Sequence, residues 1–555
     1  MKQSIGDTRF IVVVGGVISG VGKGVATASI GRILQERGHS VTLIKIDPYI
    51  NCDAGTLRPT EHGEVWVTKD GGEIDQDLGT YERFLDKDFC KKNNLTTGQI
   101  YKSVIEKERH GEYLGQTVQF IPHITGEITH RIIDASKGYD VAIIEIGGTV
   151  GDHENVPFLF SMKSLERMIG PNRCAYVLVT YLPVPGHIEE MKTKPTQQAV
   201  RMLCEQGIMP DFIVCRSKQP LDDARKKKIE EYAHVSLDHI IAAPDVQSIY
   251  QMPLVFEEQQ FGQKISEQLH LKNTQKPDWT AWNERVNTIL ASPKTVKIAI
   301  VGKYTESGNF ALTDSYLSVS QALIHAGAEL GVKVEIVWVQ ATLFEKGSEA
   351  GIKALQAVDG VIVPGGFGAT GVEGKIACIE YVRTHNIPFL GICYGLQLAV
   401  VEFARHVVGL KEANTTEVDA QTPYPVVTIL PTQKEILQDH RYGGTMRLGA
   451  YTARLNPGSL IAATYGYKDK KDADVATERH RHRYEVNPKY VEQLQKAGLY
   501  FSAYTTREDG AQLVECIELA DHSYFVATQA HPEFTSRFGN PNPLFYGLIK
   551  AVLNK

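Results

Sequence analysis

The sequence predicts an α/β protein made of two doubly wound domains. Short Val- and Ile-rich runs of strand length recur along the chain, and longer segments of helical composition separate them. Apolar runs of this kind are typical of strands in parallel sheets, which are buried on both faces. A stretch without any strand signal, residues 271–294, divides the runs into two series. Since α/β domains often reach 200–250 residues, 555 residues fit two large domains.

The two series of runs define the predicted domains, residues 1–270 and 295–555. Asn273, Pro277 and the pair Ser292-Pro293 mark the segment between them as a linker. The first series comprises Phe10–Val14, Val41–Ile46, Val141–Ile146, Tyr176–Thr180 and Phe212–Cys215, and the second comprises Val296–Val301, Val334–Val339, Gly360–Val363 and Pro388–Ile392. We find no internal repeat and no low-complexity tract.

The composition is that of an ordinary globular protein. The chain is 43% hydrophobic and 22% charged, which excludes a disordered, collagenous or coiled-coil chain. The 59 basic residues are outnumbered by 65 acidic ones, so no overall positive field attracts nucleic acid. The start of the chain lacks the pattern of a secretory signal, and no apolar run is long enough to cross a membrane. We therefore expect a cytoplasmic protein that binds neither membranes nor nucleic acid.

Eight cysteines are spread through the chain without any CxxC pair. This spacing argues against a zinc ribbon or a disulfide framework. Most cysteines of such a protein are small buried apolar residues, so a reactive one needs support from its sequence context.

A glycine-rich loop follows the first predicted strand. It runs from Gly15 to Gly24, contains Lys23, and precedes a predicted helix over Val25–Leu34. Glycines allow several backbone N–H groups to point to one centre, the helix N-terminus adds positive potential, and the lysine adds a mobile cation. A tight strand–helix turn alone would explain the glycines but not the lysine. The loop therefore predicts a phosphate-binding site.

The phosphate loop lacks the usual hydroxyl for Mg²⁺, because Lys23 is followed by Gly24 instead of Ser or Thr. Asp77, in an acidic run, and Glu145, near the end of a buried strand, are the candidate carboxylate ligands. Asp77 alone is equally consistent with a solvated acidic turn. Glu145 is the stronger candidate, because a charge at the end of a buried strand needs a partner.

Other cations offer weaker signals. Lys45 lies near the end of the second predicted strand, where ligands gather in open α/β sheets, but it is also consistent with a structural lysine at the sheet edge. The run Lys192–Gln197 combines two cations with hydroxyl and amide groups. Arg225–Lys228 is a run that usually forms a solvated helix face.

The second domain contains a candidate nucleophile, Cys393. It stands between Gly391 and Gly395, where a predicted strand turns into a helix. Such a turn exposes a side chain, and a helix N-terminus lowers a thiol pKa from about 8.5 into the range of about 3.5–7.5. A buried core thiol is the alternative interpretation.

Among the histidines, His531 has the best context as a partner for Cys393. It follows the predicted strand Phe525–Ala527 and precedes Pro532-Glu533. In an extended chain residues 531 and 533 share a face, which would let Glu533 hold the imidazole. Backbone N–H groups of the glycine-rich run Pro364–Gly368 and of Tyr394 are candidate donors to an oxyanion.

Taken together, these motifs resemble the CTP synthase family from end to end. The elbow Gly391–Gln397 with His531-x-Glu533 is similar to class I glutamine amidotransferases in general. Five further segments are specific to the CTP synthase family: Ser19–Gly24, Lys45–Asn51, His62–Val65, Glu145–Asp152 and Lys192–Gln197. The resemblance implies an N-terminal amidoligase domain of the P-loop type and a C-terminal class I glutamine amidotransferase domain.

The resemblance also implies a reaction and its ligands. UTP would be phosphorylated by ATP at O4 and aminated to CTP, with ammonia released from L-glutamine at Cys393 by a triad with His531 and Glu533 and carried through an internal passage. By similarity, Asp77 and Glu145 hold Mg²⁺, and the ATP contacts are Gly20, Val21, Gly22, Lys23, Gly24, Val25, Arg216, Asp245 and Val246. The contacts for UTP, or for inhibitory CTP, are Ser19, Lys192, Thr193, Lys194, Pro195, Thr196, Gln197 and Lys228, with Asp152 and Glu154 added for CTP. The glutamine contacts are Gly366, Tyr394, Gly395, Leu396, Gln397, Glu417 and Arg483. Lys45 would stabilise the transferring phosphoryl group together with Lys23.

The family resemblance further implies a homotetramer and activation by GTP, whose site is assigned to the less patterned region Arg109–Leu114. Two residues depart from the family pattern. Tyr394 stands where Phe is common, and His153 stands where an aliphatic residue is usual. Neither is expected to touch the reacting groups, although His153 is placed to affect inhibition by CTP. For Arg483, the run Glu478–Tyr484 is also consistent with a charged exposed strand.

Two other functions are open at this point. A related amidoligase acting on a cofactor carboxylate would share the two domains, but the Lys192–Gln197 motif argues against it. The second alternative is a phosphate-loop ATPase that assembles into filaments and keeps an inactive amidotransferase domain. The intact residues Cys393, His531 and Glu533 argue against this alternative.

Overall fold

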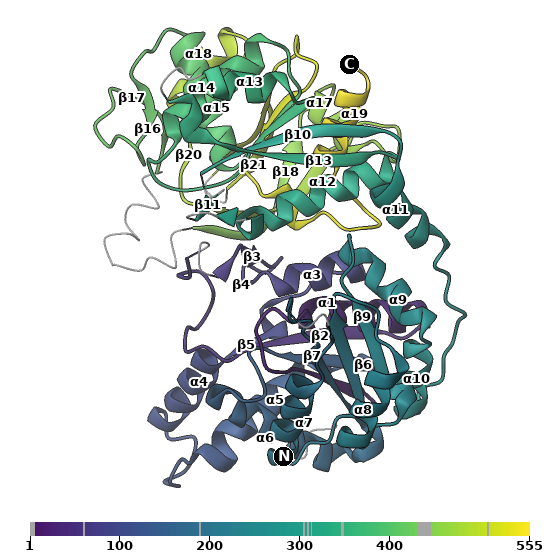
Figure 1. Cartoon of the computed structure of the whole chain (residues 1–555). Helices are drawn as coiled ribbons and strands as arrows, with labels where there is room; N and C mark the ends of the chain where they lie inside the picture. Colours follow the sequence, from purple (N-terminus) through teal and green to yellow (C-terminus); the bar gives the residue numbers. More distant parts are fainter. Residues whose placement is uncertain are drawn as a thin grey trace. The chain divides into compact units, whose positions relative to one another are not determined.

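The computed structural model divides the chain into two compact units. The first contains Met1–Ala54 and Asp77–Val286, and the second contains Gly55–Gln76 and Asn287–Lys555. The residues that the structure describes are 6–58, 62–187, 190–303, 306–307, 310–311, 313–345, 349–429, 446–507 and 510–555. Figure 1 colours the ribbon along the sequence.

A seven-stranded parallel sheet forms the centre of the first unit (Figure 1). All five runs predicted in the first domain are strands of this sheet, which confirms the predicted fold class. The order β5-β2-β6-β1-β7-β8-β9 sets β6 and β7 on either side of β1, so β1 lies at the switch point where α/β sheets bind ligands. The strands are β1 (Arg9–Gly15), β2 (Val41–Asp47), β5 (Asn94–Thr96), β6 (Val141–Ile146), β7 (Cys174–Tyr181), β8 (Phe212–Ser217) and β9 (Ile240–Pro244).

Helices connect these strands and bury their apolar faces on the sheet, as in a doubly wound fold. Helix α1 follows the glycine-rich loop, as predicted, but it begins at Lys23, two residues before the predicted start at Val25. The helices are α1 (Lys23–Glu36), α3 (Asp77–Leu85), α4 (Thr97–Arg109), α5 (Thr125–Ser136), α6 (Val156–Ile169), α7 (Lys194–Glu205), α8 (Asp223–Ala233), α9 (Met252–Glu258), α10 (Phe261–Gln268) and α11 (Thr280–Ala291). Helix α11 occupies much of the segment predicted as a linker, so this segment is not purely irregular.

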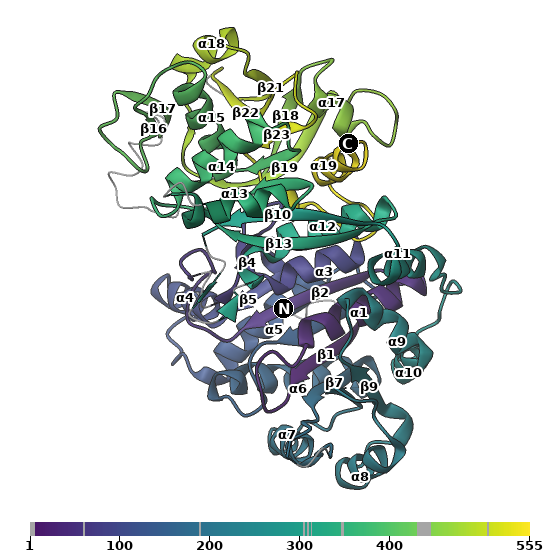
Figure 2. The same ribbon diagram turned by 45° about the horizontal axis from the view of Figure 1, so that its top comes forward.

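The second unit contains a nine-stranded mixed sheet (Figure 2). Its parallel part has the order β13-β10-β14-β15-β23 and continues into the antiparallel strands β22, β21, β18 and β19. The sequence predicted the parallel strands but not this antiparallel extension. The strands are β10 (Thr295–Gly302), β13 (Lys333–Gln340), β14 (Gly360–Val363), β15 (Phe389–Ile392), β18 (Arg447–Leu455), β19 (Val475–His482), β21 (Tyr500–Thr506), β22 (Gln512–Glu518) and β23 (Phe525–Thr528).

Two apolar clusters cover the two faces of this sheet. One contains residues of α14 and α15, and the other contains residues of α12 and α19. The helices are α12 (Leu317–Glu329), α13 (Glu349–Gln356), α14 (Val372–Thr384), α15 (Tyr394–His406), α17 (Leu460–Tyr465), α18 (Pro488–Lys496) and α19 (Pro543–Leu553), and the short strands are β11 (Glu306–Ser307), β12 (Phe310–Ala311), β16 (Ala413–Thr415), β17 (Tyr424–Thr428) and β20 (Glu485–Val486).

A hairpin from the N-terminal half of the sequence belongs to the second unit. Strands β3 (Val65–Val67) and β4 (Glu73–Asp75) pair antiparallel within residues 55–76. The backbone N–H of Ala450 donates to the carbonyl of Lys69 at 2.9 Å, and the Arg481 guanidinium is 2.8 Å from Glu73. This grouping differs from the predicted boundary at residue 270, because the hairpin's partners are distant in sequence.

No segment that crosses a membrane was expected from the sequence, and the hydropathy of the helices can be compared with that expectation. Within the described ranges, none of the helices has both the length and the apolar character that a membrane span requires.

Candidate active sites

The phosphate loop joins β1 to α1 in the first unit. Gly20 and Gly22 have positive φ angles of 72° and 93°, a backbone conformation that glycine adopts without strain. Lys23, the first residue of α1, is 8% exposed and donates from Nζ to the carbonyl oxygen of Gly148 at 2.6 Å. Burial lowers the pKa of Lys23, while Glu145 opposes that shift. The lysine therefore lies at the carboxyl end of the sheet, beside the loop.

Two carboxylates, the predicted Mg²⁺ ligands, converge next to this loop. The ammonium of Lys45 is paired with Asp77 and lies 3.5 Å from Glu145 Oε1, and Tyr81 donates its hydroxyl proton to Glu145. Burial raises the pKa of Glu145. For Asp77, burial raises the pKa but Lys45 reverses the shift and leaves it below its ordinary value. Lys45 is 4% exposed and lies on β2, between β5 and β6, so it is not on an edge strand, and its ion pairs fit a structural lysine as well as one that faces a phosphate.

Mg²⁺ is often held by one or two protein carboxylates, with phosphate oxygens and waters as its other ligands. Asp77 and Glu145 match this limited donor set. No third His, Cys, Asp or Glu joins them in a metal-type cluster among the residues that the structure describes. The pair thus fits a metal that arrives with a nucleotide.

Beside the loop is a cavity of about 380 Å³ with mostly apolar walls. Arg216 extends along it, with Nε 3.1 Å from Asp245 and with Nη1 donating to the carbonyl of Gly20 at 2.9 Å. Six of the residues predicted for ATP line this cavity: Val21, Gly22, Val25, Arg216, Asp245 and Val246.

The residues predicted for UTP and CTP lie outside the lining of that cavity. Ser19, Glu154 and Lys228 are exposed, and Lys192 is paired with Glu190 at 2.5 Å. The carboxylate of Asp152 accepts from the hydroxyl of Thr149 at 2.9 Å. Thr193, Lys194, Pro195, Thr196 and Gln197 form the start of α7 and the residue before it, and Thr196 is buried.

In the second unit, Cys393 occupies the turn between β15 and α15. It has a φ angle of 50°, a strained conformation for a residue other than glycine and typical of a nucleophile elbow. A Cβ on Gly395 would approach the carbonyl oxygen of Val363 to 2.1 Å, so the chain passes here only with glycine. Cys393 lies at the helix N-terminus, as predicted, but it is only 2% exposed, so the elbow does not expose it, contrary to the expectation from the sequence.

His531 links Cys393 to Glu533. Its Nδ1 is 2.7 Å from Glu533 Oε1, and its side chain lines the same cavity as Cys393. Burial lowers the pKa of His531, but Glu533 and Cys393 together raise it to about 10. The raised pKa favours the charged form of the imidazole at neutral pH.

The predicted extended geometry of residues 531–533 is wrong. Pro532–Phe534 form a turn of 3₁₀ helix, because Pro532 fixes its φ angle in the helical range. The pairing of His531 with Glu533 arises across this turn. The turn also brings Phe534 onto His531, with the rings stacked at 5.2 Å.

The triad faces a cavity of about 490 Å³ within the second unit. Four of the residues predicted to bind glutamine line it: Gly366, Gln397, Glu417 and Arg483. Burial raises the pKa of Glu417, whose Oε1 accepts from the N–H of Gly368 at 2.7 Å. Tyr394, Gly395 and Leu396 are buried in α15 and lie outside the lining.

The hairpin segment supplies part of this cavity, which the sequence reasoning missed. Glu64 and Val65 line it, and Glu64 Oε2 accepts from the backbone N–H of Ser318 at 2.9 Å. The His62–Val65 motif was a sequence signal for this part of the site, but it was interpreted only as a feature specific to the family. Tyr316 lines the same cavity and was also not anticipated.

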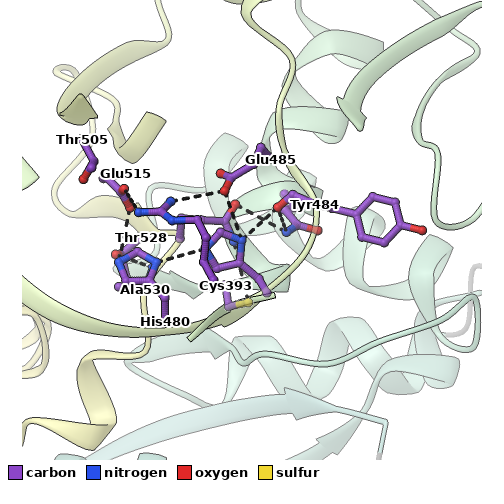
Figure 3. Close-up of polar contacts among 12 residues, drawn as sticks. Cys393, His480, Tyr484, Glu485, Thr505, Glu515, Thr528 and Ala530 are labelled. Atoms are coloured by element: carbon purple, nitrogen blue, oxygen red, sulfur yellow. Dashed lines mark hydrogen bonds and ion pairs between the residues drawn. The ribbon is translucent and has the colours of Figure 1, made fainter. Parts of the chain in front are cut away.

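A buried polar network lies beside the cysteine (Figure 3). Arg447 is 3.2 Å from Glu485 and 2.7 Å from Glu515, and burial raises the pKa of Glu485 to about 7. His480 and His482, 3.0 Å apart, are each 2% exposed, which excludes an exposed strand for the run Glu478–Tyr484.

Two glutamines lie between this network and the elbow. Gln529 Nε2 lies 3.7 Å from the sulfur of Cys393, and Gln397 Nε2 donates to the carbonyl of Tyr484 at 3.1 Å. Both side chains are buried, so the network supports one wall around the thiol.

A cysteine elbow with a histidine and a glutamate on this fold defines a class I glutamine amidotransferase domain, here joined to a phosphate-loop domain. Residues 311–551 match the family model for glutamine amidotransferase class I, and residues 9–271 match that for the CTP synthase N-terminus. The CTP synthases of Pyrococcus furiosus and Methanocaldococcus jannaschii are 50% and 49% identical, over 98% and 99% of both chains. The chain belongs to the CTP synthase family, and it is an enzyme of the ligase class.

One solved structure is also similar to the C-terminal half. It is the Trypanosoma brucei CTPS glutaminase domain with bound acivicin, which is 37% identical with a TM-score of 0.42 and covers 47% of this chain and 94% of that chain.

Proposed function

We propose that this chain aminates UTP to CTP, with ATP used at the phosphate loop and ammonia released from L-glutamine at Cys393. The observation that carries the proposal is the pairing of His531 with Glu533 beside Cys393, in a cavity that holds four predicted glutamine contacts. The near full-length similarity to curated CTP synthases supports UTP as the acceptor. The predicted domains 1–270 and 295–555 carry the amidoligase and the amidotransferase.

The amidoligase step begins at the uracil O4 atom, which is a poor leaving group. Transfer of the γ-phosphoryl group of ATP to O4 gives a 4-phosphorylated UTP, and ammonia attack at C4 then expels phosphate. Lys23 and Lys45 lie beside the loop and neutralise charge on the transferring group. Asp77 and Glu145 would hold Mg²⁺, which supplies further neutralisation when it is bound with the nucleotide.

The apolar cavity beside Arg216 suits the base of ATP. Its walls would cover the adenine ring, and Arg216, fixed by Asp245, would lie against the nucleotide. Ser19, Lys192–Gln197 and Lys228 are proposed for UTP, or for inhibitory CTP together with Asp152 and Glu154. We further propose GTP activation through Arg109–Leu114, a homotetramer and a cytoplasmic location.

The amidotransferase step uses the thiolate of Cys393. It attacks the amide carbon of glutamine, and His531 gives its proton to the departing nitrogen, so that ammonia leaves and a thioester remains. Water, deprotonated by His531, then cleaves the thioester to glutamate and free thiol. Backbone N–H groups near Gly366 and at Tyr394 are proposed to stabilise the oxyanion of both steps.

The direct test is a reconstituted reaction with UTP, ATP, Mg²⁺ and glutamine, followed by the change from uracil to cytosine absorbance. Omission of any one component should abolish the change, and GTP should accelerate it while CTP slows it. Ammonium chloride should replace glutamine at raised pH, where more of it is free ammonia. Product formation without ATP, or none with all components present, would refute the proposal.

A further inference from the structure

Lys375 is a completely buried lysine that the reaction described above does not use. It lies in the first turn of α14, between Val372 and Ile379 of the apolar cluster, and is 0% exposed. Its Nζ has no hydrogen-bond acceptor among the residues that the structure describes. Burial of a lysine at such a site is unfavourable in free energy, because the amine loses its hydration and no hydrogen bond compensates for that loss.

The amine lies behind the glycine-rich loop of the glutamine cavity. A Cβ built on Gly366 would be 3.7 Å from Lys375 Nζ, and the ring centre of Tyr394, which follows the nucleophile, is 5.4 Å from it. Gly366 lines the cavity and Lys375 does not. The amine is therefore separated from a bound glutamine by the loop itself.

The charged and titratable groups around the amine come from several elements. Lys303, at the end of β10, repels the ammonium; Cys393 on the elbow and Cys378 on α14 attract it when ionised. Burial first, and Lys303 second, lower the pKa of Lys375 to about 7. Lys375 thus changes charge near neutral pH, and a nearby negative charge favours its protonated form.

We propose that Lys375 is a positioning residue for glutamine hydrolysis, which holds the Gly365–Gly366 loop from its buried side and adds a positive charge behind it. A peptide unit carries its N–H and C=O on opposite sides. An N–H turned toward the substrate oxyanion would send a carbonyl toward the buried side, where Lys375 Nζ, which has no acceptor among the described residues, would supply the donor. This inference rests on the glutaminase part of the proposed function.

The effect should be larger in the transition state than in the bound substrate. When the thiolate attacks, the carbonyl oxygen of glutamine becomes an anion, and a protonated Lys375 behind the loop stabilises it through the oriented peptide. Because Lys375 does not touch glutamine, the affinity of the ground state depends on it little. The expected change is in kcat, with little change in KM.

The test compares Lys375→Met with wild type in the full chain. Removing one donor of an oxyanion typically costs 10²–10³-fold in rate, so an indirect contribution should lower kcat for glutamine hydrolysis by about 10-fold or more. KM for glutamine should stay within about threefold, and ammonia-dependent CTP formation should be unchanged. Lys353→Met, on the exposed face of α13, is the matched control and should leave all three values unchanged.

Two further measurements separate positioning from mere structure. Lys375→Gln keeps a donor without a charge and should recover part of the lost kcat. In wild type, kcat should decline with rising pH as Lys375 loses its proton, and this decline should be absent in Lys375→Met. Both variants should melt as cooperatively as wild type.

The inference is overturned if Lys375→Met keeps the wild-type kcat, if KM alone rises, or if ammonia-dependent synthesis falls in parallel. It is also overturned if Lys375→Gln folds but behaves like Lys375→Met. A wild-type enzyme that makes CTP from ammonia but never hydrolyses glutamine would instead refute the glutaminase part of the proposed function.

Discussion

The ring of Trp66 lies 5.0 Å from that of Phe534, and Phe534 stacks on the imidazole of His531. Trp66 is 0% exposed, and the Arg479 guanidinium lies 5.3 Å above its ring while donating to the carbonyl of Val67 at 3.0 Å. A hairpin from the N-terminal half of the sequence therefore packs behind His531, the proposed base. The position of His531 depends on this packing.

We predict that Trp66→Ala destabilises the second unit and slows glutamine hydrolysis. Deletion of a buried Trp side chain typically costs about 3–5 kcal/mol, and the cavity would let Phe534 move away from His531. Trp66→Phe keeps an aromatic ring and should lose much less of both properties. Denaturant unfolding and glutaminase assays check this, and a fully active, equally stable Trp66→Ala would contradict it.

Glu533→Gln should remove a pH-dependent contribution to stability. The pKa of His531 is raised from its ordinary 6.5 to about 10, so the folded state binds this proton more tightly than the unfolded state. The resulting stabilisation is complete below about pH 6.5 and is lost as the pH rises to about 10. The variant should be most destabilised near pH 6.5 and least near pH 10, and its glutaminase activity should fall.

Unfolding at a series of pH values checks this prediction. Glu492→Gln removes the carboxylate of an exposed pair with Lys496 on α18 and is the control. A pH-independent difference between wild type and Glu533→Gln would show that Glu533 does not set the charge of His531.

Cys393→Ala should abolish CTP formation from glutamine and retain it with ammonium chloride at raised pH. The substitution removes the proposed nucleophile of the second unit and leaves the phosphate loop of the first unit unchanged. Cys52→Ala, at an exposed cysteine, is the control and should keep both activities. If ammonia fails to rescue Cys393→Ala, the amidoligase is not a separate site.

Lys23→Met should abolish CTP formation with either nitrogen source. The ammonium beside the loop would be lost, and with it the cation that neutralises the transferring phosphoryl group. Lys218→Met, at an exposed position after β8, is the matched control. Synthesis that persists in Lys23→Met above a tenth of the wild-type rate would refute the role of the loop.

Arg447→Met should destabilise the second unit by about 3–5 kcal/mol, because it leaves Glu485 and Glu515 buried without their common partner. The loss should be larger at pH 8 than at pH 5.5, where the carboxyl groups can become neutral. Arg454→Met lies on the same strand with an exposed side chain and should have little effect. The free energy of unfolding of each variant, measured with denaturant at pH 8 and pH 5.5, checks this prediction. An equal loss at both pH values would contradict it.

Much of the fold was predictable because its information is local. The strands β1, β2, β6, β7 and β8 are largely apolar runs, and glycines mark the turns directly after β1 and β6. The same is true of the cysteine elbow, whose glycines are needed for the close approach to Val363. Such features are visible in windows of ten residues.

The features of the fold and the site that were not predicted depend on contacts between residues that are distant in sequence. The packing of Trp66 on Phe534 leaves no trace in local periodicity, so the sequence gives no sign that residues 55–76 are grouped with the second unit. The extended geometry at His531 was wrong because Pro532 begins a turn. Lys375 was overlooked, since one lysine on an apolar helix face looks like a solvated side chain until its burial is known.

The assignment of residues 55–76 to the second unit has a consequence for biosynthesis. Trp66 leaves the ribosome early, whereas Phe534 is among the last residues made. At about 5–20 residues per second, the nascent hairpin waits roughly tens of seconds for the surface that will cover it. A gene split between the halves would likewise place Trp66 and Phe534 on different polypeptides, so each fragment would display an uncovered aromatic side chain.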